Sequence, residues 1–111
     1  MNQTHIQFAP ATTYTDGTAI PAGTLLSYVA LIDTVNPPLA QFPVPAADVA
    51  AESAGVITSS FADLGFNPVP GTTYFAAVTE ASGAAVSTDS NIATFTYPAE
   101  VPNAPTGFTV A

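Results

Sequence analysis

The sequence predicts an all-β protein, an antiparallel β-sandwich of about seven short strands. Its apolar residues occur in short runs, several of which alternate with polar residues, as in strands buried on one face. The 11 prolines and 7 glycines are scattered between these runs, where they mark turns. With 111 residues and 48% hydrophobic content, the chain is long enough for one domain with one core.

The first half of the chain holds two predicted strands. In residues 3–10, apolar and polar residues alternate, which predicts a half-buried strand. Residues 11–23 contain Asp-Gly and Pro-Ala-Gly, both typical of turns. Residues 24–34 form the strongest predicted strand, with Tyr28 on one face and Leu31 on the other. Because both faces are apolar, we expect this strand to be central in its sheet.

The second half is predicted to hold four more strands and one short helix. Two prolines in residues 39–45 remove hydrogen-bond donors, so this segment can form only an edge strand. Residues 46–54 are the one helix-like stretch, too short to be stable without packing. The other predicted strands are apolar runs between turns, and they cover residues 55–61, 72–79 and 92–97.

Residues 70–78 read Pro-Gly-Thr-Thr-Tyr-Phe-Ala-Ala-Val. This run resembles the signature of fibronectin type III domains, in which a Pro-Gly-Thr-x-Tyr turn precedes alternating small apolar residues. In that family the tyrosine forms a corner, because its hydroxyl bonds back to the loop backbone. The resemblance assigns this role to Tyr74, with Leu64 as its packing partner.

Other segments extend the resemblance over nearly the whole chain. Residues 6–10 (Ile-Gln-Phe-Ala-Pro) are similar to the second strand of the family, with Phe8 in place of its usual tryptophan. Residues 27–32 resemble the third strand, and residues 87–92 resemble the last hairpin. The resemblance implies an immunoglobulin-like, Greek-key sandwich. The core residues that we predict are Ile6, Phe8, Tyr28, Ile32 and Val78.

The C-terminal segment fits the family's first strand, which normally precedes all the others. The template reads Pro-x-x-Pro-x-x-Leu-x-Val, and residues 102–110 match it with Phe in place of Leu. We therefore expect residues 1–97 to form a sandwich that lacks its first strand. Residues 98–103 would be a proline-bounded linker and residues 104–111 a terminal strand. The contact residues predicted for that strand are Pro105, Phe108 and Val110.

The linker is short for a strand that must return to its own domain. Its six residues reach about 20 Å, whereas a strand of seven or eight residues spans roughly 25 Å. A neighbouring copy requires no such return, so the sequence favours head-to-tail strand donation between copies, which builds a filament or a ring. Three other interpretations stay open: a frayed end, a strand paired in reversed direction within its own chain, or the start of a second domain.

Charge and cysteine content exclude several function classes. The chain has no Lys or Arg and a net charge of −8, so it lacks the cations that bind nucleic acid or anionic membranes. Without cysteine it has no disulfide and no thiolate metal site. No apolar run reaches the roughly 18 residues of a membrane span, and no cleavable secretory signal is visible. These features favour a structural protein of an extracellular or virion assembly, such as a phage decoration or fibre component, unless Met1 was added to a mature fragment.

No set of residues predicts catalysis or a cofactor. The single histidine, His5, has no basic partner, and neither a Gly-x-Ser-x-Gly elbow nor a phosphate-binding glycine loop is present. The acidic residues are isolated along the chain, so paired catalytic carboxylates are not expected. Asp16, Asp89 and Asn91 would be calcium ligands if their loops met at one end of the fold, although we favour turn capping as their role.

The alternative function is a monomeric adhesion module that binds glycans or another surface. Its aromatic platform would draw on Tyr14, Phe42, Phe66 and Tyr97, which core packing explains equally well. A binding module would be monomeric with an exposed aromatic strip. A structural subunit would instead show edge-to-edge contacts between copies.

Overall fold

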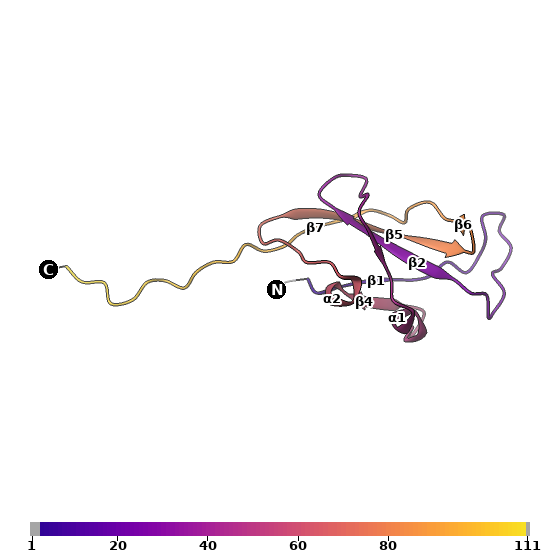
Figure 1. Cartoon of the computed structure of the whole chain (residues 1–111), viewed down its shortest axis with the longest axis horizontal. Coiled ribbons are helices and arrows are strands. Elements are labelled where there is room, and N and C mark those ends of the chain that lie inside the picture. The colour runs from indigo at the N-terminus through magenta and orange to yellow at the C-terminus, as the bar shows by residue number, and fades with distance from the viewer. Residues whose placement is uncertain (1–2, 111) are drawn as a thin grey trace.

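The computed structural model describes residues 3–110 and consists mainly of antiparallel strands, with two short helices (Figure 1). One sheet contains β1 (His5–Phe8) and β4 (Ile57–Ser60). The second sheet contains β2 (Ser27–Asp33), β3 (Gln41–Pro43), β5 (Thr73–Ser82), β6 (Ala85–Val86) and β7 (Ala93–Thr96). The helices are α1 (Ala46–Ala50) and α2 (Phe61–Leu64). The all-β prediction is confirmed.

The larger sheet has β2 in its interior. β2 pairs with β3 on one side and with β5 on the other, and β5 also pairs with β6 and β7. An interior strand is what the two apolar faces of residues 24–34 predict. β3 lies at the end of the strand order, where the prolines of residues 39–45 cost no ladder hydrogen bonds.

Two elements differ in length from those predicted. β5 continues past residue 79 to Ser82, because Gly83 adopts a φ of 61° and turns the chain back into β6. α1 is shorter than the predicted 46–54. It ends early because Ser53 and Val56 exchange two backbone hydrogen bonds of 3.0 Å, which close a turn in place of further helix.

α2 was not predicted, since Phe61 was expected to end a strand. The helix begins where the Ser60 hydroxyl accepts a hydrogen bond from the N–H of Asp63, at 3.0 Å. It ends at Gly65, whose φ of 75° suits a glycine after a helix. A serine cap and a glycine stop with only four residues between them were signals that the sequence carried, but the apolar run around them concealed the helix.

The core combines residues from both sheets with a group of aromatic rings. The ring of Phe66 contacts three others edge-on, at centroid distances of 5.5 Å to Phe42, 5.0 Å to Phe61 and 5.1 Å to Tyr74. The buried cluster consists of Tyr28, Ala30, Ile32, Val44, Ile57, Phe61, Leu64, Phe66 and Tyr74. Three further residues expected in the core, Ile6, Phe8 and Val78, pack against this cluster but are only partly buried.

Residues 98–110 form neither helix nor strand and are exposed. They extend away from the sheets along the longest axis of a molecule that measures 77 × 28 × 19 Å (Figure 1, yellow). A strand needs a hydrogen-bonded neighbour, and the described part of the same chain places none beside residues 104–110. Met1, Asn2 and Ala111 lie outside the described residues.

Asp33, the last residue of β2, holds the loop that leads to β3. Its carboxylate accepts hydrogen bonds from the backbone N–H groups of Thr34 (2.8 Å), Leu39 (3.3 Å) and Ala40 (3.1 Å). These hydrogen bonds favour the charged carboxylate and lower the pKa of Asp33 from its ordinary value of 3.8. The bond from the N–H of Thr34 has the largest effect.

We expect Asp33 to contribute to acid unfolding. Because its pKa is lower in the folded chain than in the unfolded chain, its stabilisation is present above pH 3.8 and is lost as the pH falls through the folded pKa. The variant Asp33→Asn should therefore have a lower urea midpoint than the parent at about pH 6, and the difference should shrink towards about pH 2.5. Glu100→Gln, in the exposed C-terminal segment, serves as the control. A difference that stays constant over this pH range would contradict the assigned role.

Candidate functional site

In the part of the chain that the structure describes, the outer edge of β1 has no strand beside it. β1 pairs with β4 from His5 opposite Ser60 to Phe8 opposite Ile57. Within residues 3–110, no other strand pairs with β1. A sheet edge of this kind presents unpaired backbone N–H and C=O groups and is a template for another strand.

The side chains behind this edge are incompletely covered. Ile6 and Phe8 alternate with the exposed His5 and Gln7, and both pack against the core while remaining only partly buried. The ring of Phe8 lies 5.2 Å from that of Tyr28 in the opposite sheet. A further strand along the edge would remove Ile6 and Phe8 from water, so the site is apolar as well as unpaired.

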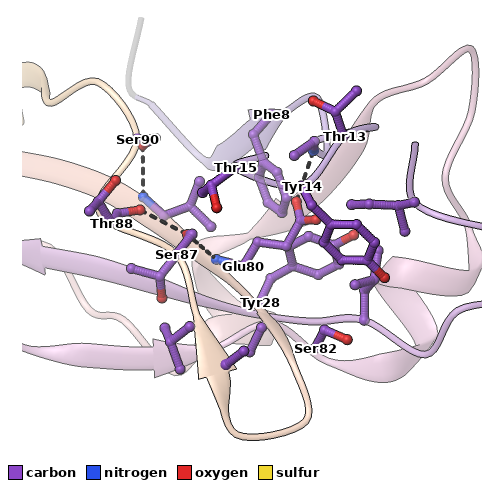
Figure 2. A pocket seen from close by; sticks show the side chains of 18 of the residues that line it. Phe8, Thr13, Tyr14, Thr15, Tyr28, Glu80, Ser82, Ser87, Thr88 and Ser90 are labelled. Atoms are coloured by element: carbon purple, nitrogen blue, oxygen red, sulfur yellow. Dashed lines mark hydrogen bonds between the residues drawn. The ribbon is translucent and has the colours of Figure 1, made fainter. Parts of the chain in front are cut away.

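A cavity of about 410 Å³ opens at the end of β1. β1 contributes Phe8, the loop before β2 contributes Tyr14 and Ile20, and the larger sheet contributes Tyr28 and Val78. Figure 2 shows the rings of Phe8, Tyr14 and Tyr28 gathered around it. The cavity therefore lies at the Phe8 end of β1, between the loop after β1 and the larger sheet.

Glu80 forms part of the cavity wall. Its Oε1 accepts a hydrogen bond from the backbone N–H of Ala11 at 2.8 Å, which ties the loop after β1 to β5 (Figure 2). Burial, and secondarily the negative charge of Glu80, raise the pKa of Tyr28 above its ordinary value of 10.0. The Tyr28 side chain is therefore neutral at physiological pH, and it adds no charge to the cavity.

Two serines complete the wall on the other side of β5. The hydroxyl of Ser87 accepts a hydrogen bond from the N–H of Glu80 at 2.9 Å, and that of Ser90 accepts one from the N–H of Val78 at 3.0 Å (Figure 2). The N–H groups of Val78 and Glu80 in β5 thus have hydrogen-bond partners although no regular strand pairs with these N–H groups. The side chains of Glu80, Ser87 and Ser90 are already hydrogen-bonded to backbone groups, and the surface that an occupant of the cavity would meet is mainly apolar.

The C-terminal segment presents apolar side chains to solvent. Val101, Phe108 and Val110 are 83%, 88% and 89% exposed. Phe108 and Val110 are two residues apart, so they share one face when the segment is an extended strand. Single exposed apolar residues are common on protein surfaces. A phenyl ring and a valine on one face, however, match Ile6 and Phe8, the partly buried apolar pair behind the edge of β1.

The exit of this segment from the sheets is set by the turn before β5. Tyr74 is 6% exposed, and its hydroxyl accepts a hydrogen bond from the N–H of Val69 at 2.8 Å, the type of bond that forms a tyrosine corner. In the same turn, the N–H of Gly71 donates to the carbonyl of Tyr97 at 2.8 Å. A Cβ built on Gly71 would lie 3.8 Å from that of Ala99, so the segment leaves the fold in contact with this turn.

The calcium candidates Asp16, Asp89 and Asn91 have different surroundings in the structure. Asp16 caps a turn: its Oδ1 accepts hydrogen bonds from the hydroxyl (2.6 Å) and N–H (3.0 Å) of Thr18, which lower the pKa of Asp16. Asp89 borders a different cavity, and Asn91 is exposed. Within residues 3–110 there is no group of three or more His, Cys, Asp or Glu residues that could hold a metal ion.

The four aromatic residues considered for glycan binding do not form one exposed strip. Phe66 is 7% exposed, and Phe42 and Tyr97 pack against the core. Tyr14 is 39% exposed and borders the cavity beside β1. His5 is exposed at the start of β1 and belongs to no group of three or more His, Cys, Asp or Glu residues that could hold a metal ion in the described part of the chain.

Sequence reasoning missed the cavity, because its wall combines loop residues with no recognisable motif. Two signals were present. Ile20 and Leu26 are large apolar residues in a segment otherwise rich in turns, where a fully solvated loop would carry polar ones. Ser87 and Ser90 stand three residues apart in a polar run, and their hydroxyls can bond to the backbone of a neighbouring strand.

The helices of the described chain are short. Within residues 3–110, none is long and apolar enough to cross a membrane. Comparisons of the chain with protein-family models, with curated proteins and with solved structures found no match.

Proposed function

We propose that the chain is a non-enzymatic structural subunit that assembles head to tail by strand donation. Residues 104–110 of one copy pair with the outer edge of β1 in the next copy. One observation carries this proposal: the chain combines an unpaired sheet edge, backed by apolar residues that are only partly buried, with a free segment that has two apolar side chains at strand spacing. The partners are therefore copies of the same chain.

The fold that we propose is an immunoglobulin-like sandwich, similar to fibronectin type III, that lacks its first strand. The division of the strands into two sheets supports this assignment, as does a core drawn from both sheets. The bond between the hydroxyl of Tyr74 and the N–H of Val69 supports it further. In such a sandwich the missing strand would lie along β1, which is where we place the donated segment.

The direction of the C-terminal segment suits donation. In Figure 1, β1 starts near the end of the molecule at which this segment leaves, and β1 runs towards the loop of residues 9–26 at the other end. The C-terminal segment runs the opposite way. A copy displaced along the long axis would thus receive the segment antiparallel to its own β1. The contact is heterologous and gives a filament, or a ring if the rotation between copies closes.

The lengths also agree. The linker, residues 98–103, reaches about 20 Å when extended, which carries the chain clear of its own sheets. The seven residues 104–110 span about 23 Å as a strand, more than the roughly 14 Å of a four-residue strand such as β1. The donated segment can therefore cover the whole unpaired edge.

The setting that we propose is an extracellular or virion assembly, such as a phage decoration or fibre component. The absence of Lys and Arg removes every site for trypsin-like cleavage, which suits a protein that is exposed to its surroundings. A net charge of −8 with sparse charged residues keeps single copies soluble without offering a surface for nucleic acid.

The test compares the mass of the full chain with that of a version that ends at Ala99, by light scattering on purified protein. We expect large assemblies from the full chain and particles near the 11.2 kDa of one copy from the shortened version. The shortened version should remain folded, because among the described residues neither the buried cluster nor the apolar residues packed against it extend beyond Tyr97. If the full chain and the shortened version are both stable monomers, the proposal is overturned. The glycan-binding alternative would then take precedence, and a glycan screen would test it. Assembly of both versions would place the contact outside the C-terminal segment.

Binding in trans provides an independent test. A synthetic peptide with the sequence of residues 102–111 should bind the version that ends at Ala99, as measured by calorimetry. A control peptide with serine in place of Phe108 and Val110 should not bind detectably. Equal binding of the two peptides would contradict a contact that depends on apolar side chains.

A further inference from the structure

We infer a defined register and a defined occupant for the interface: Phe108 of one copy fills the cavity at the end of β1 in the next copy, opposite Phe8. This inference rests on the proposed strand donation and specifies how it takes place. It assigns a binding role to a cavity that the core leaves open. The occupant is a second copy of the chain.

The pattern of side chains restricts the register. Ile6 and Phe8 face the core, while His5 and Gln7 face outwards. Directly opposed residues of antiparallel strands lie on the same face, so the apolar residues of the donated strand must oppose Ile6 and Phe8. A slip of one residue would turn both Phe108 and Val110 towards water. The possible registers therefore differ from one another by an even number of residues.

The direction of the donated strand then decides whether Phe108 or Val110 lies opposite Phe8. The donated strand enters at the end of β1 that carries Phe8 and runs towards Ile6, because it is antiparallel to β1. Phe108 precedes Val110 in the chain, so Phe108 opposes Phe8 and Val110 opposes Ile6. Both apolar pairs form in this register. Thr109 then opposes Gln7, and both of these side chains face outwards.

The cavity favours this register over the two registers that are shifted from it by two residues. An apolar cavity of about 150 Å³ is large enough for benzene, so the 410 Å³ beside Phe8 has room for the Phe108 ring. A shift by two residues one way would put Phe108 opposite Ile6 and leave the cavity empty. A shift the other way would carry it past the end of β1 and leave Ile6 uncovered.

Ring geometry provides a further reason to place an aromatic residue there. Phe8 and Tyr28 already form a tilted pair at 5.2 Å, and the ring of Tyr14 lies at the same cavity (Figure 2). A third partner can therefore meet two or three rings edge-on or offset, the arrangements that aromatic side chains prefer. Val110, which is smaller, would lie over Ile6, which does not line this cavity.

The register can be measured by disulfide trapping, because the chain has no cysteine of its own. Three double variants share Thr109→Cys and add His5→Cys, Gln7→Cys or Ala9→Cys. Disulfides need Cα atoms about 4.4–6.8 Å apart. Directly opposed residues meet this limit, whereas positions two residues along are about 7–8 Å away. We expect Thr109→Cys with Gln7→Cys to give a ladder of covalent oligomers on a non-reducing gel, at a yield at least tenfold above the other two pairs.

The possible results separate the register from the donation itself. A ladder that is strongest with His5→Cys or Ala9→Cys would overturn the register and leave donation standing. Assemblies by light scattering with no ladder from any pair would overturn pairing along β1. A full chain that stays monomeric would overturn both. The single variants Thr109→Cys and Gln7→Cys are the controls, since random oxidation of one cysteine stops at a dimer.

Tryptophan fluorescence can report separately on whether position 108 enters the cavity. The chain contains no tryptophan, so an introduced one is the only source of indole emission. In the variant Phe108→Trp, the introduced indole should emit at shorter wavelength and resist quenching by acrylamide in the assembled state. Dilution to single copies should reverse both changes. Val101→Trp, in the linker, is the matched control and should stay accessible to quencher at all concentrations. An accessible indole at position 108 within assemblies would overturn the cavity assignment.

Discussion

Replacing Phe108 by aspartate is expected to abolish assembly and to leave single copies of 11.2 kDa. In one copy this side chain is 88% exposed and supports nothing, so the unfolding free energy should change by less than about 0.5 kcal/mol. In the proposed interface it is buried, and burial of a Phe side chain is worth about 1.5–3 kcal/mol. A carboxylate at the same place would be desolvated beside Glu80 without a cation to pair with it, which adds to the loss.

The controls for this variant lie in the same segment. Val101→Asp introduces the same charge at an equally exposed apolar position in the linker, and it should assemble like the parent. Phe108→Leu keeps an apolar side chain and should assemble with reduced affinity. Light scattering over a range of concentrations measures all three variants. Assembly of Phe108→Asp at parental concentrations would contradict insertion of this side chain into a neighbour.

Replacing Phe66 by alanine is expected to cost about 3–5 kcal/mol of unfolding free energy, the range for truncation of a buried Phe. The ring is 7% exposed and contacts Phe42, Phe61 and Tyr74 at once. Its removal therefore opens a cavity where β3, α2 and β5 meet. Since small domains have only about 5–15 kcal/mol of net stability, the variant should be close to unfolding at 37 °C.

Urea denaturation followed by far-UV circular dichroism measures this loss. Leu25→Ala is the matched control, because Leu25 is 90% exposed and its truncation should change stability by less than about 0.5 kcal/mol. A loss below 1 kcal/mol for Phe66→Ala would show that the aromatic group can close around the gap, contrary to the packing described above.

The strands could be predicted where the local pattern and the tertiary environment agree. Residues 24–34 are apolar on both faces, and β2 is an interior strand with Tyr28 and Ile32 buried. The turn at residues 70–72 was visible in the sequence because proline fixes its own φ and glycine adopts the positive φ that turns require, here 80° at Gly71. The hydroxyl of Tyr74 then reaches the N–H of Val69 across that turn.

The features that could not be predicted depend on long-range contacts. No local pattern indicates that the loop after β1 is tied to β5 through Ala11 and Glu80, a bond between residues 69 positions apart. Nor does alternation in residues 3–10 reveal that Ile6 and Phe8 remain only partly covered, since coverage depends on which strand lies beside them. The C-terminal segment matches a strand template, yet its conformation is decided by whether a partner is present.

The tail and the unpaired edge, which lie on one chain, give the proposed polymer two chemically different ends. One end carries a free donor segment and the other an empty acceptor, as in a monomer that bears two complementary reactive groups. A copy without the tail can still accept the free donor segment at one end of a growing filament. Because it has no donor segment of its own, no further copy can then be added at that end. Mixing such copies with intact ones would set the mean filament length through their ratio alone, so a proteolytic nick in residues 98–103 would act as a chain terminator.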